Sequence, residues 1–101
     1  IIDRERNLWI GTHNGLAKLE SERFVNFDKR DGLPNGLIFS LAADREGDMW
    51  IGTDNGLTVI VGNRMTDLTS LHPKLATGVR FLYRTRDGRM LAGCEEFAVI
   101  E

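Results

Sequence analysis

The sequence predicts an all-β fold, and three observations lead to that prediction: a repeat of 41 residues, short apolar runs between turn residues, and a hairpin signal inside the repeat. Sliding the sequence along itself by 41 positions, from Trp9 to Trp50, places "ERNLWIGTHNGL" on "EGDMWIGTDNGL" without a gap. Periods of about 40–45 residues are typical of propeller blades and of some helical repeats. The local pattern therefore has to decide between strands and helices.

Short runs of β-branched, aromatic and aliphatic residues favour strands. The second copy holds four such runs, separated by Gly, Asn and Asp: "LIFSLAA", "MWIGT", "LTVIV" and "RMTDL". No segment shows sustained apolar spacing of three and four, and the 11 glycines would disrupt the long helices of a helical repeat. Four antiparallel strands in 41 residues describe one blade of a β-propeller, and we predict that fold.

A hairpin signal joins the second and third runs of each copy. The dipeptide Asn-Gly occurs at 14–15 and again at 55–56. A type I′ turn needs positive φ angles at both central residues, which Asn and Gly tolerate. We therefore predict type I′ turns centred on Asn14 and Gly15 and on Asn55 and Gly56.

A third copy of the repeat is degenerate. A second shift of 41 carries Gly52 onto Gly93, with Leu91 in the place of Trp and Cys94 in the place of Thr. We expect the turn "CEEF" to be one residue shorter than "TDNGL". That deletion would bring Phe97, Val99 and Ile100 onto Leu57, Val59 and Ile60.

The repeat also predicts how the chain is organised. We expect one propeller domain in three parts: the end of a first strand and the remaining strands of blade one (1–31), a complete second blade (32–72), and a partial third blade (73–101). The 101 residues hold about 2.5 repeats, whereas propellers close with about four to eight blades. We expect an incomplete propeller: either a piece of a larger chain, or chains that complete one another by self-association.

The repeated Trp has a structural interpretation. One large side chain per blade, Trp9 and Trp50, can wedge between neighbouring blades and bury about 150–250 Å². Two positions later, Gly11 and Gly52 would allow the backbones to approach closely. The alternative is a row of Trp side chains lining a sugar-binding surface.

Composition excludes several classes of function. A net charge of −2 gives no sign of a basic surface for nucleic acid, and no apolar run approaches the roughly 20 residues that span a bilayer. The single cysteine, Cys94, permits no intrachain disulfide, and no Cys/His cluster has metal-ligand spacing. His13 and His72 have no nucleophile near them in sequence, so we expect no catalytic residue, metal or cofactor. The stretch "DREGD" at 44–48 predicts a β-turn rather than a calcium loop, because it lacks enough oxygen ligands.

The motifs resemble those of the two-component regulator propeller family. The resemblance rests on "DRERNLWIGTHNGL", then "DGLPNG" at 31–36, then "DREGDMWIGTDNGL", and it extends weakly over the third copy. It implies an extracytoplasmic, periplasmic sensor region of a bacterial inner-membrane receptor. In such receptors a histidine kinase or diguanylate cyclase usually follows as the output domain, and neither is present in these 101 residues. The resemblance also implies a ligand such as a carbohydrate.

In a propeller, the loops between second and third strands share one face with the connections between blades. Polar side chains that converge at such a face can bind a small ligand. The candidate ligand-binding residues there are His13, Asp54, Asp31, Asn35, Thr12 and Thr53. The alternative is that Asn14 and Asn55 form turns, that the two threonines make hydrogen bonds within the loops, and that Asp31 starts a turn. His13 and Asp54 are then the better candidates, because nothing about a turn demands either.

Three functional hypotheses follow. The first is a non-catalytic ligand-sensing module, and the second is a protein-interaction scaffold of the WD type that uses the same face. The third is a propeller lyase or glycosidase, whose acidic pair would have to include Asp31 and Asp54.

Overall fold

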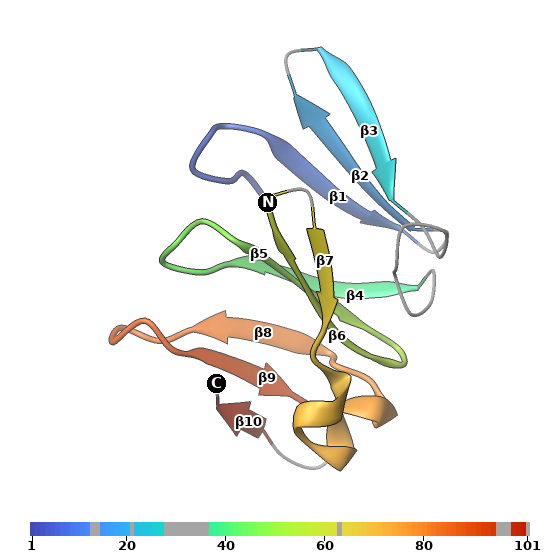
Figure 1. The fold of residues 1–101 in the computed structure, drawn as a ribbon, viewed down its shortest axis with the longest axis vertical. Helices are drawn as coiled ribbons and strands as arrows, with labels where there is room; N and C mark the ends of the chain where they lie inside the picture. Colours follow the sequence, from blue (N-terminus) through green and yellow to red (C-terminus); the bar gives the residue numbers. More distant parts are fainter. Residues whose placement is uncertain (13–14, 21, 28–36, 63, 95–97, 101) are drawn as a thin grey trace.

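The structure is a computed structural model, and it describes the chain except for residues 13–14, 21, 28–36, 63, 95–97 and 101. Three antiparallel sheets follow one another along the chain and lie face to face in a row (Figure 1). The predicted all-β fold of propeller blades is confirmed. No helical segment within the described part has the length and apolar character needed to cross a bilayer.

The middle sheet contains the four strands that the second copy predicts. Their spatial order equals their chain order: β4 (Ile38–Ala43), β5 (Met49–Thr53), β6 (Gly56–Val61) and β7 (Arg64–Asp67). All neighbours pair antiparallel, with Trp50 opposite both Ala42 and Val59. The register between β4 and β5 shifts between Ile38 and Ser40, which marks a bulge in β4.

The first sheet is formed by β1 (Leu8–Thr12), β2 (Gly15–Glu20) and β3 (Arg23–Phe27). Ile1 and Ile2 lie beside β1, where the other sheets have their first strand. Ile1 exchanges both backbone hydrogen bonds with Trp9, at 3.1 and 2.8 Å, and Ile2 forms a bridge with Leu8. The pairing of Ile1 with Trp9 reproduces that of Ala42 with Trp50, at the repeat distance.

The third sheet has the order β10-β9-β8 and corrects the expected deletion. Its strands are β8 (Phe81–Arg84), β9 (Met90–Gly93) and β10 (Ala98–Ile100). Leu91 pairs with Ile100, as Trp50 pairs with Val59. Ile100 therefore takes the place of Val59 rather than of Ile60, and the shift of 41 continues without a gap. The expected one-residue deletion is wrong, because Val99 and Ile100 are both apolar and their side chains alone do not fix the register.

The connection between the second and third sheets contains two 3-10 helices, η2 (Thr69–Leu71) and η3 (Pro73–Thr77). His72 separates the two helices, and its Nδ1 accepts a hydrogen bond from the backbone of Lys74. Leu75 of η3 is fully buried, so the connection contributes to the core.

The predicted type I′ turn at 55–56 is wrong. Thr53 pairs with Gly56, so Asp54 and Asn55 form the two-residue loop. Positive φ angles occur in the described residues at Arg6, Glu22 and five glycines, and neither Asn55 nor Gly56 is among them. The Thr53 hydroxyl accepts from the Asn55 N–H and donates to the Gly56 carbonyl, which closes the turn one position earlier. Of the equivalent turn at 14–15, Asn14 lies outside the described residues, and Gly15 has φ 139°.

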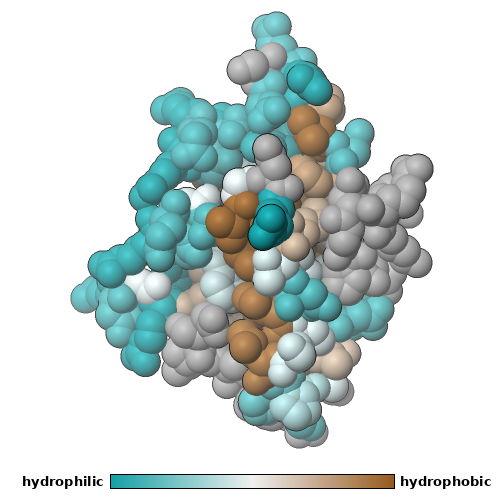
Figure 2. Space-filling model, in the orientation of Figure 1, coloured by the Kyte–Doolittle hydropathy of each residue, from teal (hydrophilic) through white to brown (hydrophobic). Residues whose placement is uncertain are grey.

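The core lies between the sheets, in two clusters. Trp9 (5% exposed) and Leu16 of the first sheet pack with Met49, Ile51 and Ile60 of the second. Trp50 (7% exposed) packs across the next gap in a cluster that joins the second sheet, η3 and the third sheet: Ala42, Leu57, Val59, Leu75, Val79, Met90, Ala92 and Cys94. Each Trp thus lies between its own sheet and the following one. Figure 2 shows a narrow apolar band crossing from sheet to sheet, with hydrophilic surface along the edge that carries the β4–β5 and β8–β9 turns.

Gly11 and Gly52 lie where the following element comes close. A Cβ on Gly11 would lie 2.5 Å from the Ile38 side chain of the next sheet. A Cβ on Gly52 would lie 2.6 Å from the Val79 carbonyl oxygen and would also collide with the Ser40 hydroxyl. Any larger residue would push the sheets apart at these two points.

Candidate functional site

The hairpins between second and third strands form one edge of the row of sheets. In the middle sheet, Thr53 is fully buried and its hydroxyl closes its own turn, so it presents no polar group to solvent. Thr12 makes the equivalent hydrogen bond, from its hydroxyl to the Gly15 carbonyl at 2.9 Å, and is exposed. The two threonines therefore act within their hairpins.

The connections between sheets lie beside this hairpin. The Asp54 N–H donates to the carbonyl of Leu37, which directly precedes β4, at 3.3 Å. On the other side, the Val79 N–H donates to the Thr53 carbonyl at 2.8 Å, and Gly78 approaches the Asp54 backbone. Asp54 is therefore half-buried between two connections, which is the arrangement expected of a propeller face. His13, Asn14, Asp31 and Asn35 lie outside the described residues.

Gly56 was predicted to form the turn, but the structure gives it a different role. A Cβ at this position would collide with the side chain of Thr69 in η2. The Thr69 hydroxyl accepts from the Leu57 N–H at 3.1 Å, so the start of η2 is fixed against β6. Gly56 is therefore needed for the close approach of the connection, and not for a positive φ angle.

The opposite edge carries the turns between first and second strands, which we name the 1–2 turns (residues 3–7, 44–48 and 85–89). An aspartate organises the first two. Asp44 accepts hydrogen bonds from the Glu46 and Asp48 N–H groups through Oδ1, and from the Trp50 indole at 2.8 Å through Oδ2. The stretch 44–48 thus forms the predicted β-turn, with the carboxylate tying it to the interface Trp.

Asp3 repeats this geometry around Trp9. Its carboxylate accepts from the backbone of Glu5 and Asn7, from the Asn7 side chain, and from the Trp9 indole at 2.7 Å. Burial alone would raise the pKa of Asp3, but the hydrogen bonds from Trp9, Asn7 and Glu5 outweigh it and lower the pKa below its usual value. In the next turn, burial together with the charges of Asp44 and Glu46 raises the pKa of Asp48, and the charge of Arg4 offsets part of this rise.

The third 1–2 turn replaces both partners of this pair. Thr85 stands in the place of the aspartate, and its hydroxyl accepts from the Arg89 N–H at 3.0 Å. Leu91 stands in the place of Trp, opposite Tyr83, where the second sheet has Trp50 opposite Ala42. The large aromatic side chain is therefore on the first strand in the third sheet and on the second strand in the other two. The third copy retains the turn and an aromatic residue, but it lacks the carboxylate at the first position of the turn.

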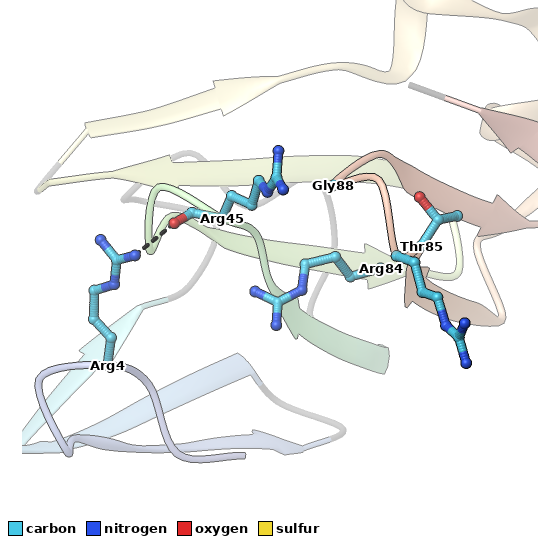
Figure 3. A pocket seen from close by; sticks show the side chains of 6 residues that line it. Arg4, Arg45, Arg84, Thr85 and Gly88 are labelled. Atoms are coloured by element: carbon cyan, nitrogen blue, oxygen red, sulfur yellow. Dashed lines mark hydrogen bonds between the residues drawn. The ribbon is translucent and has the colours of Figure 1, made fainter.

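An arginine recurs in each of the three 1–2 turns, at intervals of 41 residues. Arg4, Arg45 and Arg86 occupy the same position in the three turns. Arg4 crosses to the next turn and donates to the Arg45 carbonyl at 2.6 Å and to the Glu46 carbonyl at 3.4 Å (Figure 3). Its stem lies over Gly47, and Arg45 lies over Gly88 in the same way. Arg4 therefore ties the first turn to the second by hydrogen bonds, whereas Arg45 only packs against the third turn.

A pocket of about 590 Å³ opens at these arginines. Its described lining consists of Arg4, Arg45, Arg84, Thr85, Arg86 and Gly88 (Figure 3). Arg84 donates to the Asp44 carbonyl at 3.2 Å and so also reaches from the third sheet to the second. None of these residues is among those for which the repeat motifs predicted a role. The recurrence of Arg at the second position of three turns is the signal that could have found them.

Cys94 directly follows β9 and is 8% exposed, within the core cluster around Trp50. Burial raises the pKa of its thiol, against a smaller effect of Lys74. A buried thiol with a raised pKa is a poor nucleophile. The described residues contain no group of three or more His, Cys, Asp or Glu side chains placed to hold a metal ion.

Comparison with known proteins agrees with this architecture. Residues 32–55 match the sequence profile of the two component regulator propeller family. None of the curated protein sequences is significantly similar to the chain. The extracellular domain of BT3049 from B. thetaiotaomicron, assigned as a hybrid two component system, superposes with a TM-score of 0.87 over 99% of the chain, at 17% identity.

The extracellular domain of BT4673 from the same organism is more similar in sequence. Its two structures, assigned as a one component and as a hybrid two component system, share 26% and 27% identity over 94% and 93% of the chain, each with a TM-score of 0.78. The chain spans only 14–15% of the length of these three solved chains. The resemblance read from the motifs is confirmed over residues 32–55, which match the two component regulator propeller repeat.

Proposed function

We propose that the chain is part of the extracytoplasmic sensor region of a bacterial signal-transduction receptor. The observation that carries this proposal is the similarity of nearly the whole chain, at 26–27% identity, to the extracellular domain of BT4673. The match to the regulator propeller profile over residues 32–55 supports it independently. The segment supplies no output activity of its own, and it acts by presenting a binding face.

The proposed ligand face is the edge that carries the hairpins between second and third strands. Asp54 is its central described residue, half-buried between the two connections that flank the middle sheet. A carboxylate at this position can accept hydrogen bonds from hydroxyl groups, as a carbohydrate would offer. His13, Asp31 and Asn35 belong to the same proposal through their positions in the repeat.

Thermal denaturation of the full chain with a panel of oligosaccharides tests this function. A ligand that binds only the folded state stabilises it by RT ln(1 + [L]/Kd), about 2.7 kcal/mol at a hundredfold excess over Kd. We expect at least one saccharide to raise the melting temperature in proportion to the logarithm of its concentration. Asp54→Asn should abolish that shift, whereas Glu5→Gln, exposed on the opposite edge, should retain it.

Two results would contradict the proposal. A saccharide shift that persists unchanged in Asp54→Asn would place binding elsewhere on the molecule. The absence of any shift, together with capture of a protein partner that Asp54→Asn weakens, would instead establish the interaction scaffold on the same face.

A further inference from the structure

The 1–2 turns change charge along the row of sheets, and the change is greatest in the degenerate third copy. Residues 43–48 hold one arginine and three acidic residues, for a net charge of −2. The equivalent residues 84–89 hold three arginines and one aspartate, for a net charge of +2. Thr85 replaces an aspartate and Arg84 replaces an alanine. The third copy therefore gained positive charge where it lost its carboxylate.

Of the added arginines, Arg84 joins the recurring arginines at one pocket, whereas Arg89 forms an ion pair with Asp87 at 3.1 Å. Four of the 13 basic residues of the chain line this pocket, although the chain as a whole is acidic. In the part of the chain that the structure describes, no acidic residue contributes to this lining, and none of the four guanidinium groups lies at ion-pair distance from a carboxylate. Positive charge that no carboxylate at ion-pair distance neutralises attracts anions, which favours a bound anion at this pocket.

Two of the four guanidinium groups, those of Arg4 and Arg84, are held in place and keep donors for a ligand. Arg4 uses two of its five N–H donors on the carbonyls of Arg45 and Glu46, and Arg84 uses one on Asp44. These bonds tie both side chains to backbone atoms of the middle sheet. Figure 3 shows the Arg84 guanidinium reaching from its own turn toward the turn that carries Arg45. Part of the entropy cost of ordering these side chains is thus met before a ligand arrives.

We propose that the 1–2 turns of three successive sheets form an anion-binding site for a phosphate or sulfate group. Arg4, Arg45, Arg84 and Arg86 supply the positive charge. Guanidinium forks match the geometry of such oxyanions with paired hydrogen bonds, which a lysine cannot offer. Thr85 also lines the pocket, where the first two turns have an aspartate, but its hydroxyl donates to the Asp87 carboxylate, so the guanidinium groups supply the donors for the anion. The site lies at the edge opposite the proposed ligand face, so it is a second site on the same blades.

Titration of the full chain with sodium sulfate and with sodium phosphate, followed by backbone amide NMR, tests the site. Both salts are added between about 0.1 and 10 mM at constant ionic strength set by sodium chloride, because screening alone changes exposed charges. We expect saturable shifts confined to the amides of Arg45, Gly47 and residues 84–88. A larger affinity for one of the two anions identifies the group that the site prefers.

Variants separate binding from folding. Arg45→Gln combined with Arg86→Gln removes two guanidinium groups that make no hydrogen bond to the described residues, so the fold is retained. We expect this double variant to weaken binding about tenfold or more, and the matched control Arg64→Gln on β7 to bind as the wild type does. The proposal is overturned if sodium chloride alone reproduces the shifts, if they do not saturate, or if the double variant binds unchanged.

Discussion

At the scale of single residues, the aspartate of the 1–2 turn has two functions. Its Oδ1 closes the turn and its Oδ2 holds the indole of the interface Trp, in the first and second copies alike. The loss of Asp and Trp together in the third copy fits this pairing, because either partner alone would leave a buried polar group unsatisfied. The turn, the Trp and the contact between sheets therefore form one unit.

Asp44→Asn tests that unit. An amide at this position cannot accept at both of its ends, so its NH₂ group would face either the Trp50 indole N–H or the turn N–H groups. We expect a loss of about 1–3 kcal/mol in the free energy of unfolding, measured by urea denaturation. Asp48→Asn is the control in the same turn, and it should be neutral or stabilising because its carboxylate is crowded by Asp44 and Glu46.

The lowered pKa of Asp3 predicts a dependence of stability on pH. A carboxylate whose pKa is lower in the folded state stabilises fully above its unfolded pKa of about 3.8, and that contribution is lost as the pH falls through the folded value. We expect the free energy of unfolding to fall below about pH 4, and to fall less steeply in Asp3→Asn. Urea denaturation between pH 5 and about pH 2 measures both slopes, and equal slopes would exclude Asp3 as a source.

Arg6 occupies a position that suits glycine. Its φ angle is 70°, whereas the equivalent residues of the other two turns are Gly47 and Gly88, both with φ 88°. A left-handed conformation costs a residue with a side chain about 1–2 kcal/mol, and glycine avoids this cost. Glycine also gives the unfolded chain more conformational freedom, which offsets part of the gain in stability. We expect Arg6→Gly to raise the midpoint of thermal unfolding. Glu5→Gly, one position earlier and without a positive φ angle, should lower it.

At the scale of elements, the spacing between sheets depends on small residues as much as on Trp. The Val79 carbonyl lies near Gly52 because the Val79 N–H is bonded to the Thr53 carbonyl, so it cannot withdraw easily. We expect Gly52→Ala to cost about 2 kcal/mol or more through overpacking. Gly62→Ala should cost only about 1 kcal/mol, since its φ angle is 64° and no atom lies within 4 Å of the new Cβ. Equal losses in chemical denaturation would contradict this account.

The sequence was sufficient to predict the strands of the middle sheet, because period and punctuation are local properties. It was not sufficient for the hairpin, where the hydroxyl of Thr53 selects a turn that the Asn-Gly rule does not describe. The hydrogen bonds of Arg4 to the next turn could not be predicted either, since the acceptors are backbone carbonyls 41 and 42 residues away. Of the candidate ligand-binding residues, Thr53 could not be recognised as buried until the neighbouring connections were placed.

At the scale of the whole molecule, the outer face of the first sheet is apolar. Leu8 and Ile10 are 36% and 37% exposed, whereas the equivalent Met49 and Ile51 are 2% and 0% exposed under Trp9. Ile2 and Phe24 extend the same face, as their pairing shows. The outer face of the first sheet thus resembles the face of the second sheet that packs against Trp9. It is therefore suited to pack against another blade.

We therefore expect the full chain to associate through this face. Light scattering coupled to size exclusion should give a mass above the 11.4 kDa of one chain, and Ile10→Lys should reduce it. Val61→Lys is the control, because Val61 is similarly exposed, at 48%, at the end of β6 in another sheet. A monomeric wild-type chain at about 100 μM would refute association through the exposed face.

The placement of each Trp also limits the symmetry of any such assembly. Trp9 contacts the second sheet and Trp50 the third, so every contact runs in one direction along the row. The outer face of the third sheet carries Phe81 and Tyr83 on the side of the Trp position, and it differs from the receiving face of the first sheet. Copies that join by these two faces meet through unlike surfaces, so they close into rings or extend as open filaments, and in a ring of two each copy uses both of its faces.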